Sequence, residues 1–556
     1  MTRKMDSGQE RFQTHEVANV PPALVDYNLF TTDRVLSETT AREGAGWATA
    51  DLTAFGEKLG RAESIELGFL ANRNLPILHT HDRFGRRRDE VEYHPSWHEL
   101  MSISVGQGLH ASPWSDPKDG AHVARAAGLF MLVQVEAGVM CPTTTTYAAV
   151  PALRRQPELA AEWEPMILPR RYDPRFRPAK EKTGVLVSMG MTEKQGGTDL
   201  RTNASRAVPI GGGGPGGEYR IVGHKWFFSI PMCDAFLVTA QAPGGLSCFL
   251  MPRWTPDGAV NGLRLQRLKD KLGNRANASS EVEFQDAWAR LVGEEGRGVV
   301  TIMEMVNYTR LDCAVGSAAQ IRQAVAQAIH YASHRQVFQR ALVEQPLMAQ
   351  VLADLAIESE VATALVLRLA RAFDRQNDEH ETTLRRLITP AIKYWTTKRC
   401  PAIVTEALES FGGVGYIEEC IMPRLYREAP LNSIWEGSGN VMCLDVRRAL
   451  ARSPESATAL VTELRLARGS DARLDRAIAE LEPKLRDADM AEAQGRTLVE
   501  QIVLALAGSL LVRFAPRAVA DAFCGSRLAG KWTGAFGTLP AGVDVRAIVQ
   551  RAAPYL

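Results

Sequence analysis

Apolar residues recur at helical spacing in two long stretches, residues 51–172 and residues 298–448. This spacing is typical of helices that bury one or more faces. The second stretch contains the longest periodic runs, which are residues 318–333, 347–373 and 383–411. Pro390 and Pro401 interrupt the third run. Three or four long helices with short links predict an up-and-down bundle.

Between these stretches the pattern changes to short runs rich in β-branched and aromatic residues. They are residues 185–191, 219–229, 235–240, 247–251 and 280–284. Turn-forming residues separate them and no long helix intervenes, so they predict an antiparallel β domain rather than a Rossmann unit. The glycine run at residues 211–216 formally matches G-x-G-x-x-G, but it precedes a strand and contains Pro215. We interpret it as a mobile hairpin loop and not as a dinucleotide site.

The two ends of the chain have patterns of their own. Residues 1–45 are mixed in character and contain Pro21 and Pro22, which predicts an extended arm. After Pro454 a further helical unit begins, and its apolar run is residues 502–512. That run is shorter than the roughly 20 residues that span a bilayer, so we expect a buried helix and no membrane segment. No apolar leader follows the N-terminus, which is consistent with a cytoplasmic protein.

The predicted fold class is therefore α+β, with five units in sequence. They are an N-terminal arm (1–45), a helical domain (46–182), a β domain (183–295), a helical bundle (296–450) and a C-terminal helical domain (451–556).

Composition and charge change this picture little. The formal net charge is +1, so the chain as a whole has no electrostatic signature of a nucleic-acid or membrane protein. The eight cysteines show no CxxC and no paired spacing, which predicts reduced thiols rather than disulfides or a zinc site. The pairs His79/His81 and His94/His98 lack partners at ligand spacing. We interpret them as surface or core histidines and expect no metal.

The main chemical candidate is Glu436, within the segment N-S-I-W-E-G-S-G-N at residues 432–440. Gly437 and Gly439 permit backbone conformations in which the main chain could approach a flat ligand closely. In an apolar pocket the pKa of Glu436 would rise, and the carboxylate would become a usable base. From this segment alone, a solvated turn carboxylate is the better supported interpretation.

Six segments in order resemble motifs of the acyl-CoA dehydrogenase family. Residues 191–199 (MTEKQGGTD) resemble TEP-x-x-GSD, residues 223–229 (GHKWFFS) resemble G-x-K-x-W-I-T-N, and residues 335–338 (RQVF) with Gln345 resemble R-x-x-FG…Q. Residues 411–416, 424–427 and 434–438 resemble GGxGY, RLYRD and IYEGT. The resemblance implies a helical domain, an antiparallel β-barrel and a four-helix bundle, here followed by an extra helical domain.

The resemblance also implies a FAD cofactor and an oligomer, expected to be a homotetramer. The residues it places on FAD are Met191, Thr192, Gly197, Thr198, Phe227, Phe228, Ser229, Arg335, Phe338, Gln345, Gly412, Gly413, Trp435, Gly437, Ser438 and Asn440. Phe227 would stack on the isoalloxazine ring, unless it is barrel core, and Ser229 would bond near N5. Arg335, Phe338 and Gln345 would reach the FAD of a neighbouring subunit, although Arg335 could instead cap a helix.

Glu436 falls on the catalytic base of the family, which removes the proton α to a thioester carbonyl while a hydride passes to the flavin. One branch of the family carries its base immediately before the arginine of the first bundle helix. Here Thr309 precedes Arg310, so no carboxylate competes. Three departures put ordinary acyl-CoA specificity in doubt: Glu409, Gln339 and Lys194 stand where Gln, Gly and Pro are usual.

Residues 42–47 (REGAGW) and 267–275 (RLKDKLGNR) extend the resemblance to an alkylation-response branch of this family. That branch is known for FAD tetramers that bind double-stranded DNA through the C-terminal domain. By this resemblance Arg447, Arg448, Arg513 and Lys531 are expected to contact DNA. Residues 447–556 contain 16 Lys and Arg against 12 Asp and Glu, so a solvated helical face stays equally open. The alternative function is a metabolic dehydrogenase of a short or branched acyl-CoA.

Overall fold

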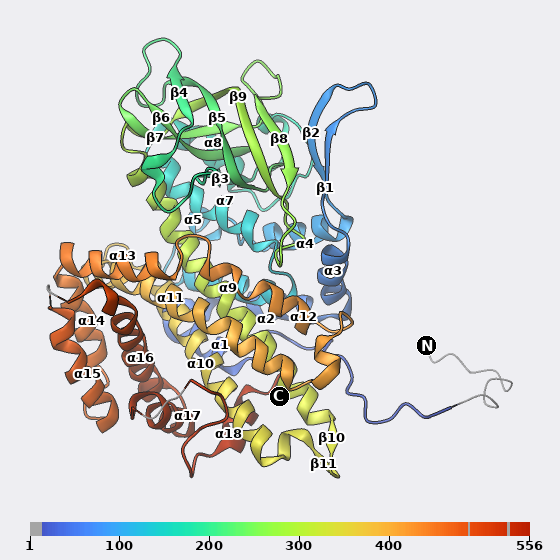
Figure 1. Ribbon diagram of the computed structural model, residues 1–556, viewed down its shortest axis with the longest axis vertical. Helices are drawn as coiled ribbons and strands as arrows, with labels where there is room; N and C mark the ends of the chain where they lie inside the picture. The colour runs from blue at the N-terminus through green and yellow to red at the C-terminus, as the bar shows by residue number, and fades with distance from the viewer. Residues whose placement is uncertain (1–13, 488–489, 531–533, 556) are drawn as a thin grey trace.

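The computed structural model describes residues 14–487, 490–530 and 534–555. A β domain occupies one end of the elongated molecule and a helical bundle the other, with N-terminal helices between them (Figure 1). The C-terminal helices pack against the side of the bundle. This is the predicted order of helical, β, helical-bundle and extra helical units.

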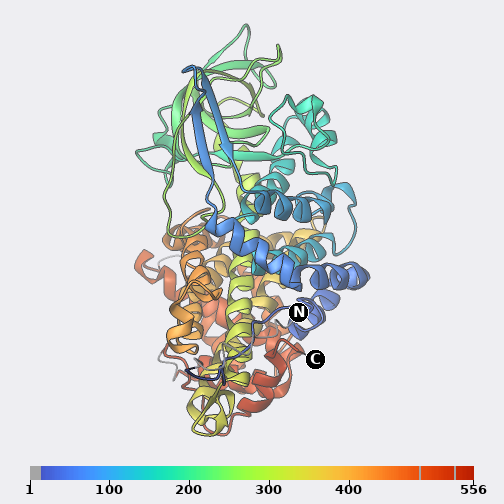
Figure 2. The same cartoon turned by 90° about the vertical axis from the view of Figure 1, so that its right-hand side faces the viewer.

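The N-terminal region is helical, with one exception. Its helices are α1 (Arg34–Thr40), α2 (Thr49–Gly60), α3 (Ala62–Arg73), α4 (Pro95–Gly106), α5 (Ser112–Ser115), α6 (Ala121–Val135), α7 (Met140–Leu153) and α8 (Pro157–Ile167). The expectation of an extended arm through residue 45 is wrong at its end, because α1 lies within it. The exception is a hairpin, β1 (Ile77–His81) and β2 (Arg87–Glu92), that projects beside the β domain (Figure 2). This hairpin was not predicted from the sequence, because apolar and polar residues do not alternate clearly along its charged, half-exposed strands.

The β domain is a closed barrel. Its strands are β3 (Val187–Gly190), β4 (Arg206–Pro209), β5 (Glu218–Ser229), β6 (Ala235–Ala242), β7 (Gly245–Pro252), β8 (Leu263–Leu268) and β9 (Ser279–Leu291). The path β6-β4-β5-β9-β7 closes through the β6–β7 pairing. The expectation of a purely antiparallel domain is wrong in two places, since β3 and β4 both pair with β6 in parallel. Residue periodicity predicts strands but not the direction of their neighbours. The glycine run at 211–216 joins the antiparallel strands β4 and β5, as expected of a hairpin loop.

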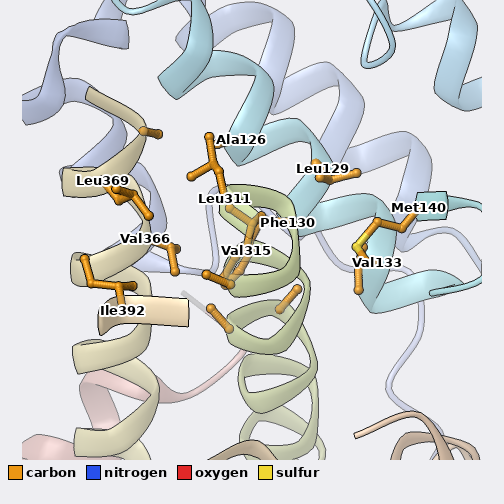
Figure 3. Close-up of a cluster of buried hydrophobic side chains, with 14 of the residues drawn as sticks. Ala126, Leu129, Phe130, Val133, Met140, Leu311, Val315, Val366, Leu369 and Ile392 are labelled. Carbon is orange, nitrogen blue, oxygen red and sulfur yellow. The ribbon is translucent and has the colours of Figure 1, made fainter. Parts of the chain in front are cut away.

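The bundle is built on three long helices, α9 (Gly298–His334), α10 (Pro346–Asp374) and α11 (Glu379–Glu409), followed by α12 (Met422–Glu428) and α13 (Gly439–Arg452). Pro390 and Pro401 lie inside α11 without ending it. The core continues from the bundle into the N-terminal helices. Figure 3 shows Phe130 of α6 beside Leu311 of α9, with Met140 of α7 on one side and Val366 of α10 on the other, all within one core cluster. The bundle and the helical domain therefore form one packed body.

The C-terminal helices are α14 (Glu455–Arg465), α15 (Ala472–Leu485), α16 (Gly495–Phe514), α17 (Arg517–Phe523) and α18 (Val545–Ala552). Buried ion pairs join them to the bundle: Arg368 to Glu463 at 3.0 Å and Arg527 to Glu358 at 2.8 Å. The span Glu492–Phe514 is long and apolar enough to cross a membrane, but 67% of it is buried within the molecule. It has the burial of a core helix.

Candidate active site

The loop that carries Glu436 has a strained backbone held by buried cations. Glu436 has a φ of 58° and Gly437 a φ of 100°, and the first of these is unusual for a residue with a side chain. The Nζ of Lys393, from α11, donates to the carbonyls of Trp435 (2.7 Å) and Gly437 (2.5 Å). The Nε of Arg310, from α9, donates to the carbonyl of Glu436 at 3.1 Å. Three consecutive carbonyls are thus fixed, which determines where the Glu436 side chain lies.

The Glu436 carboxylate accepts a hydrogen bond from the hydroxyl of Thr309 at 2.7 Å. Burial raises the pKa of Glu436, while Thr309, Lys393 and Arg310 oppose that rise. A raised pKa is expected of a general base that acts near neutral pH. Thr309, at the alternative base position, therefore donates a hydrogen bond to the base candidate Glu436 and is not a base itself.

Lys393 and Asp445 were not singled out from the sequence. Lys393 is fully buried, and burial lowers its pKa to about 8. Asp445 holds Arg310 in place at 2.7 Å and is itself held by Arg386 at 2.8 Å. The position of Lys393 inside the apolar run of residues 387–395 could have identified it from the sequence, because a charged side chain is rarely buried unless it has a structural or functional role.

The β domain contributes the opposite wall. Ser229 ends β5, is half-buried, and lies 3.2 Å from the hydroxyl of Ser279 at the start of β9. Cys141, at the start of α7, connects the two walls. Burial, together with the nearby charge of Glu436, raises the pKa of its thiol to about 12, while Lys271 and hydrogen bonds from Asn277 and Ser229 oppose the rise. Cys141 therefore lies near both Ser229 and Glu436.

A buried ion pair supports the loop that contains Met191, Thr192, Gly197 and Thr198. Lys225 of β5 contacts Glu193 at 2.8 Å, with both side chains fully buried. Burial acts to raise the pKa of Glu193, but Lys225 and two backbone N–H donors outweigh it and lower the pKa to about 2.

The same loop can fold against Thr192 only because position 197 is glycine. A Cβ there would lie 2.3 Å from the Thr192 hydroxyl. The hydroxyl of Thr192 is thus packed directly against the main chain, and Thr198 is exposed at the loop surface. Sequence reasoning selected the loop but missed the Glu193–Lys225 pair that holds it.

Phe227 and Phe228 have different environments. A register shift between Lys225 and Phe228 breaks the alternation of β5, and Phe227 is 50% exposed. It is therefore not barrel core, and the Nζ of Lys269 lies 4.9 Å from the centre of its ring. Phe228 is fully buried, with its ring 4.2 Å from that of Phe236. The prediction that Phe228 contacts the cofactor is corrected for its side chain, which is core; only its main chain can face a ligand.

Three comparisons with known proteins establish the family and the fold. Residues 19–174 match the adaptive response protein AidB N-terminal domain, residues 188–287 the acyl-CoA dehydrogenase middle domain, and residues 296–451 the acyl-CoA dehydrogenase C-terminal domain. The chain is 48% identical to AidB of Escherichia coli strain K12 over 92% of this chain and 94% of that protein. The chain belongs to the AidB-like branch of the acyl-CoA dehydrogenase family.

A second relative of this acyl-CoA dehydrogenase-like oxidoreductase comes from Caenorhabditis elegans. Acyl-CoA dehydrogenase family member 11 is 29% identical over 84% of this chain and 79% of the relative. The crystal structure of Caenorhabditis elegans ACDH-11 in complex with C11-CoA superposes with a TM-score of 0.84 at 26% identity, over 94% of this chain and 95% of that one. The predicted family and fold are confirmed.

Within this dehydrogenase-like chain, a second group of predicted cofactor residues lies far from Ser229. The long helix α9 carries Thr309 near one end and Arg335 just past the other, about 40 Å apart at 1.5 Å per residue. Arg335 and Phe338 lie on or beside the small hairpin of β10 (Gln336–Val337) and β11 (Arg340–Ala341). Phe338 is 92% exposed. These residues therefore lie outside the site of their own chain.

Hydrogen bonds hold this distal region. The guanidinium of Arg335 donates to the carbonyl of Asn19 at 2.6 Å, and Gln345 donates to the carbonyl of Val337 at 2.9 Å. Gly412 and Gly413, at the end of α11, are exposed. Arg335 thus ties the N-terminal segment to the hairpin.

Three further predicted residues surround Glu436. The indole of Trp435 donates to Asn432 at 2.8 Å, which orients the ring beside the base. Ser438 and Asn440 are exposed at the start of α13. Asn440 accepts a hydrogen bond from Arg496 at 2.9 Å.

The four basic residues expected to contact DNA differ in exposure and in ion pairing. Arg448 is exposed on α13, and Arg447 is half-buried beside it. Arg513 is held by Glu463 at 3.2 Å, so its charge is compensated, and it is a weaker candidate than the sequence implied. Lys531 lies outside the described residues. Of the three described residues, Arg448 is the exposed one.

Proposed function

We propose that the protein is a FAD flavoprotein that retains an acyl-CoA dehydrogenase site, with Glu436 as its base, and that binds double-stranded DNA through a cationic face. The observation that carries the catalytic part is the Glu436 loop: Lys393 and Arg310 fix its carbonyls, and Thr309 donates to the Glu436 carboxylate. The half-exposed Phe227, the close approach at Gly197 and the half-buried hydroxyl of Ser229 fit a flat cofactor. Bound FAD would accept the hydride.

The residues of this chain have separate tasks in the proposed reaction. Glu436 removes the proton α to the thioester carbonyl, and its own N–H polarises that carbonyl. Lys393 and Arg310 hold the loop so that the carboxylate stays within reach of the proton. Thr309 stabilises the ionised carboxylate between turnovers. The relative crystallised with C11-CoA makes a medium-length acyl-CoA the natural first probe.

The test is an anaerobic titration of the flavin with a panel of acyl-CoAs that includes a C11 acyl chain. We expect bleaching of the flavin absorbance, slowed by about 10²–10⁴-fold in Glu436→Gln, as is typical when a general base is lost. Glu436→Asp is the matched control, because it keeps the carboxylate and should retain part of the rate. Equal bleaching by wild type and Glu436→Gln would overturn the assignment of the base.

For DNA binding, the supporting observation is a strip of cations along α13. Lys398 lies against the first turn of this helix and Arg496 bonds to it, while Arg447, Arg448 and Arg452 follow on α13 itself. None of these five forms an ion pair with another residue in the part of the chain that the structure describes. Unneutralised cations in a row are what phosphate binding requires, and affinity grows with the number of phosphates neutralised.

This proposal is tested with a labelled duplex at about 50 and 200 mM salt. We expect Arg448→Ala combined with Arg452→Ala to reduce the slope of log affinity against log salt by about 2, since each cation accounts for about one unit. Arg465→Ala is the control, because Arg465 is already paired with Glu482 at 3.0 Å. If the double variant bound as tightly as wild type at both salt concentrations, α13 would not be the surface.

The proposed assembly is a homotetramer in the cytoplasm. The exposed hairpin with Phe338 and the distance between Thr309 and Arg335 support an assembly in which neighbouring chains complete each other's sites. Protection of DNA against alkylation would follow from binding together with flavin chemistry near the duplex. Comparing the survival of alkylated cells that carry wild type, Glu436→Gln or the α13 double variant separates these two contributions.

A further inference from the structure

A cavity of about 250 Å³ lies outside the site described above. It is enclosed by α4, by the end of strand β2, by the segment after α8 and by the turn from β5 into β6. Figure 1 shows the hairpin of β1 and β2 beside β8, with α4 directly below it. The cavity is therefore built partly from the region that matches the AidB N-terminal domain, residues 19–174, and partly from the barrel.

Aromatic and sulfur-containing side chains form much of its wall: Tyr93, Trp97, Tyr172, Phe176, Met101 and Met232. The rings of Tyr93 and Trp97 stack at 5.0 Å between centroids. Such walls favour planar ligands, since aromatic rings pack best against other flat groups.

One polar group of the wall is unsatisfied. The hydroxyl of Tyr93 is buried and has no acceptor for its hydrogen among the described residues, since the nearby backbone N–H of Ala278 is itself a donor. A buried donor without an acceptor is costly and calls for an explanation. A ligand with a carbonyl or a ring nitrogen would supply that acceptor. His98, in contrast, already bonds to Tyr172 at 2.9 Å.

The charges around the cavity are internally matched. Three carboxylates of the wall have a cationic partner, Asp234 with Lys182 (2.7 Å), Asp173 with Arg175 (2.5 Å) and Glu90 with Arg88 (2.9 Å), and Glu92 forms a hydrogen bond with the His79 ring (2.9 Å). A charged ligand would have to break one of these pairs or lie buried without a counter-ion, and both are unfavourable. The wall therefore selects an uncharged molecule.

The volume limits the size of the ligand. Pockets for drug-sized molecules usually enclose about 300–1,000 Å³. The present cavity falls just below that range, so it suits a molecule of one or two rings. Nucleotides and coenzyme A are too large and too charged for it.

Ile230 connects this cavity to the proposed catalytic site. It lines the cavity, is 4% exposed, and directly follows Ser229. Its φ is 55°, a left-handed conformation that is a genuine outlier for a β-branched residue. The related family motif has Asn here, which tolerates this conformation. Strain of this kind persists at functional sites, so the isoleucine side chain in the cavity wall requires a reason.

We propose that this cavity binds a small, uncharged, planar organic molecule bearing a hydrogen-bond acceptor, and that Ile230 transmits its occupancy to Ser229. The first part stands on the cavity alone. The second part rests on the proposed function, because Ser229 reports on the cavity only if FAD lies against it.

Binding is tested on the full-length protein as purified, with 5-bromoisatin as the probe, because isatin is planar, neutral and rich in carbonyl acceptors. We expect a bromine anomalous peak between Tyr93 and Tyr172 in soaked crystals and saturable binding in solution. Two variants that fill the cavity, Leu186→Phe and Met232→Phe, should each weaken binding at least tenfold. The anionic isatin-5-sulfonate should bind at least tenfold more weakly than the neutral probe. Absence of the peak, or equal binding by a filled variant that is folded, would overturn the proposal.

The connection to Ser229 is tested by the flavin spectrum. Probe binding should shift the flavin absorbance bands of wild type, and Ile230→Asn should bind the probe while losing the shift. An unchanged shift in Ile230→Asn would overturn the role of Ile230. If the protein binds the probe but takes up no FAD, the cavity proposal stands and the proposed function fails. If it holds FAD and shows no bromine peak, the cavity proposal alone fails.

Discussion

Removing the hydroxyl of Thr309 should raise the pKa of Glu436 and move the acidic limb of the pH–rate profile to higher pH. Thr309 is buried and donates to the carboxylate at 2.7 Å. A hydrogen bond to a charged group contributes about 1.5–3 kcal/mol. The same hydroxyl also lies 2.9 Å from the carbonyl of Val306, which competes for its hydrogen, so the lower end applies. At 1.36 kcal/mol per pKa unit, Thr309→Val should raise the pKa of Glu436 by about one unit.

The assay is the rate of flavin reduction by a saturating acyl-CoA, measured anaerobically across pH. The base acts when ionised, so the rate rises with pH through the pKa of Glu436, and a raised pKa shifts that rise to higher pH. Thr309→Ser is the matched control because it keeps the hydroxyl and should leave the limb in place. A Thr309→Val profile that coincides with wild type would refute the assignment of Thr309 as the donor that tunes the base.

Three further outcomes are expected. Burial raises the pKa of Glu436 in the folded protein, so the ionised carboxylate destabilises the fold above that pKa. Glu436→Gln should therefore raise the melting temperature near pH 8. The difference in melting temperature between the variant and wild type should vanish below the ordinary pKa of a glutamate. Lys225→Met leaves Glu193 buried without its partner, so urea unfolding should show a free energy of unfolding lower by about 3–5 kcal/mol, together with weaker FAD retention. Adding Glu193→Leu should recover part of the lost free energy of unfolding. Glu463→Gln weakens the buried pair with Arg368 and should make the segment between α13 and α14 more sensitive to limited proteolysis, with no change in sensitivity elsewhere.

The sequence predicted the elements with strong periodicity and the residues with a recognisable motif. The order of units, Glu436 as base candidate and the absence of a carboxylate at position 309 follow from local pattern and resemblance. Lys393 and the Glu193–Lys225 pair were missed, because only the folded chain shows that these charges are buried against partners distant in sequence. Phe228 was misjudged because a register shift in β5 decides which aromatic side chain faces out.

Tertiary pairing also explains the unequal outcome for the cationic residues. In the sequence Arg513 and Arg448 look alike, because each has few acidic residues close to it in the chain. In the structure Glu463, 50 residues away in sequence, is paired with Arg513, whereas Arg448 faces solvent. Charge counts along a sequence cannot distinguish the two cases. The parallel pairings of β6 were beyond reach for a similar reason, since they join strands that are not consecutive.

In the proposed assembly, the length of α9 would lead to mutual complementation between subunits. Each chain would bring its own Glu436 to one site and its own Arg335 to a neighbour's. In a mixed pair of a Glu436→Gln chain and an Arg335→Glu chain, both lesions then fall in one site and the other site is intact. Co-assembly of two inactive variants should therefore restore up to half of the activity, a result that an enzyme with self-contained subunits would not give.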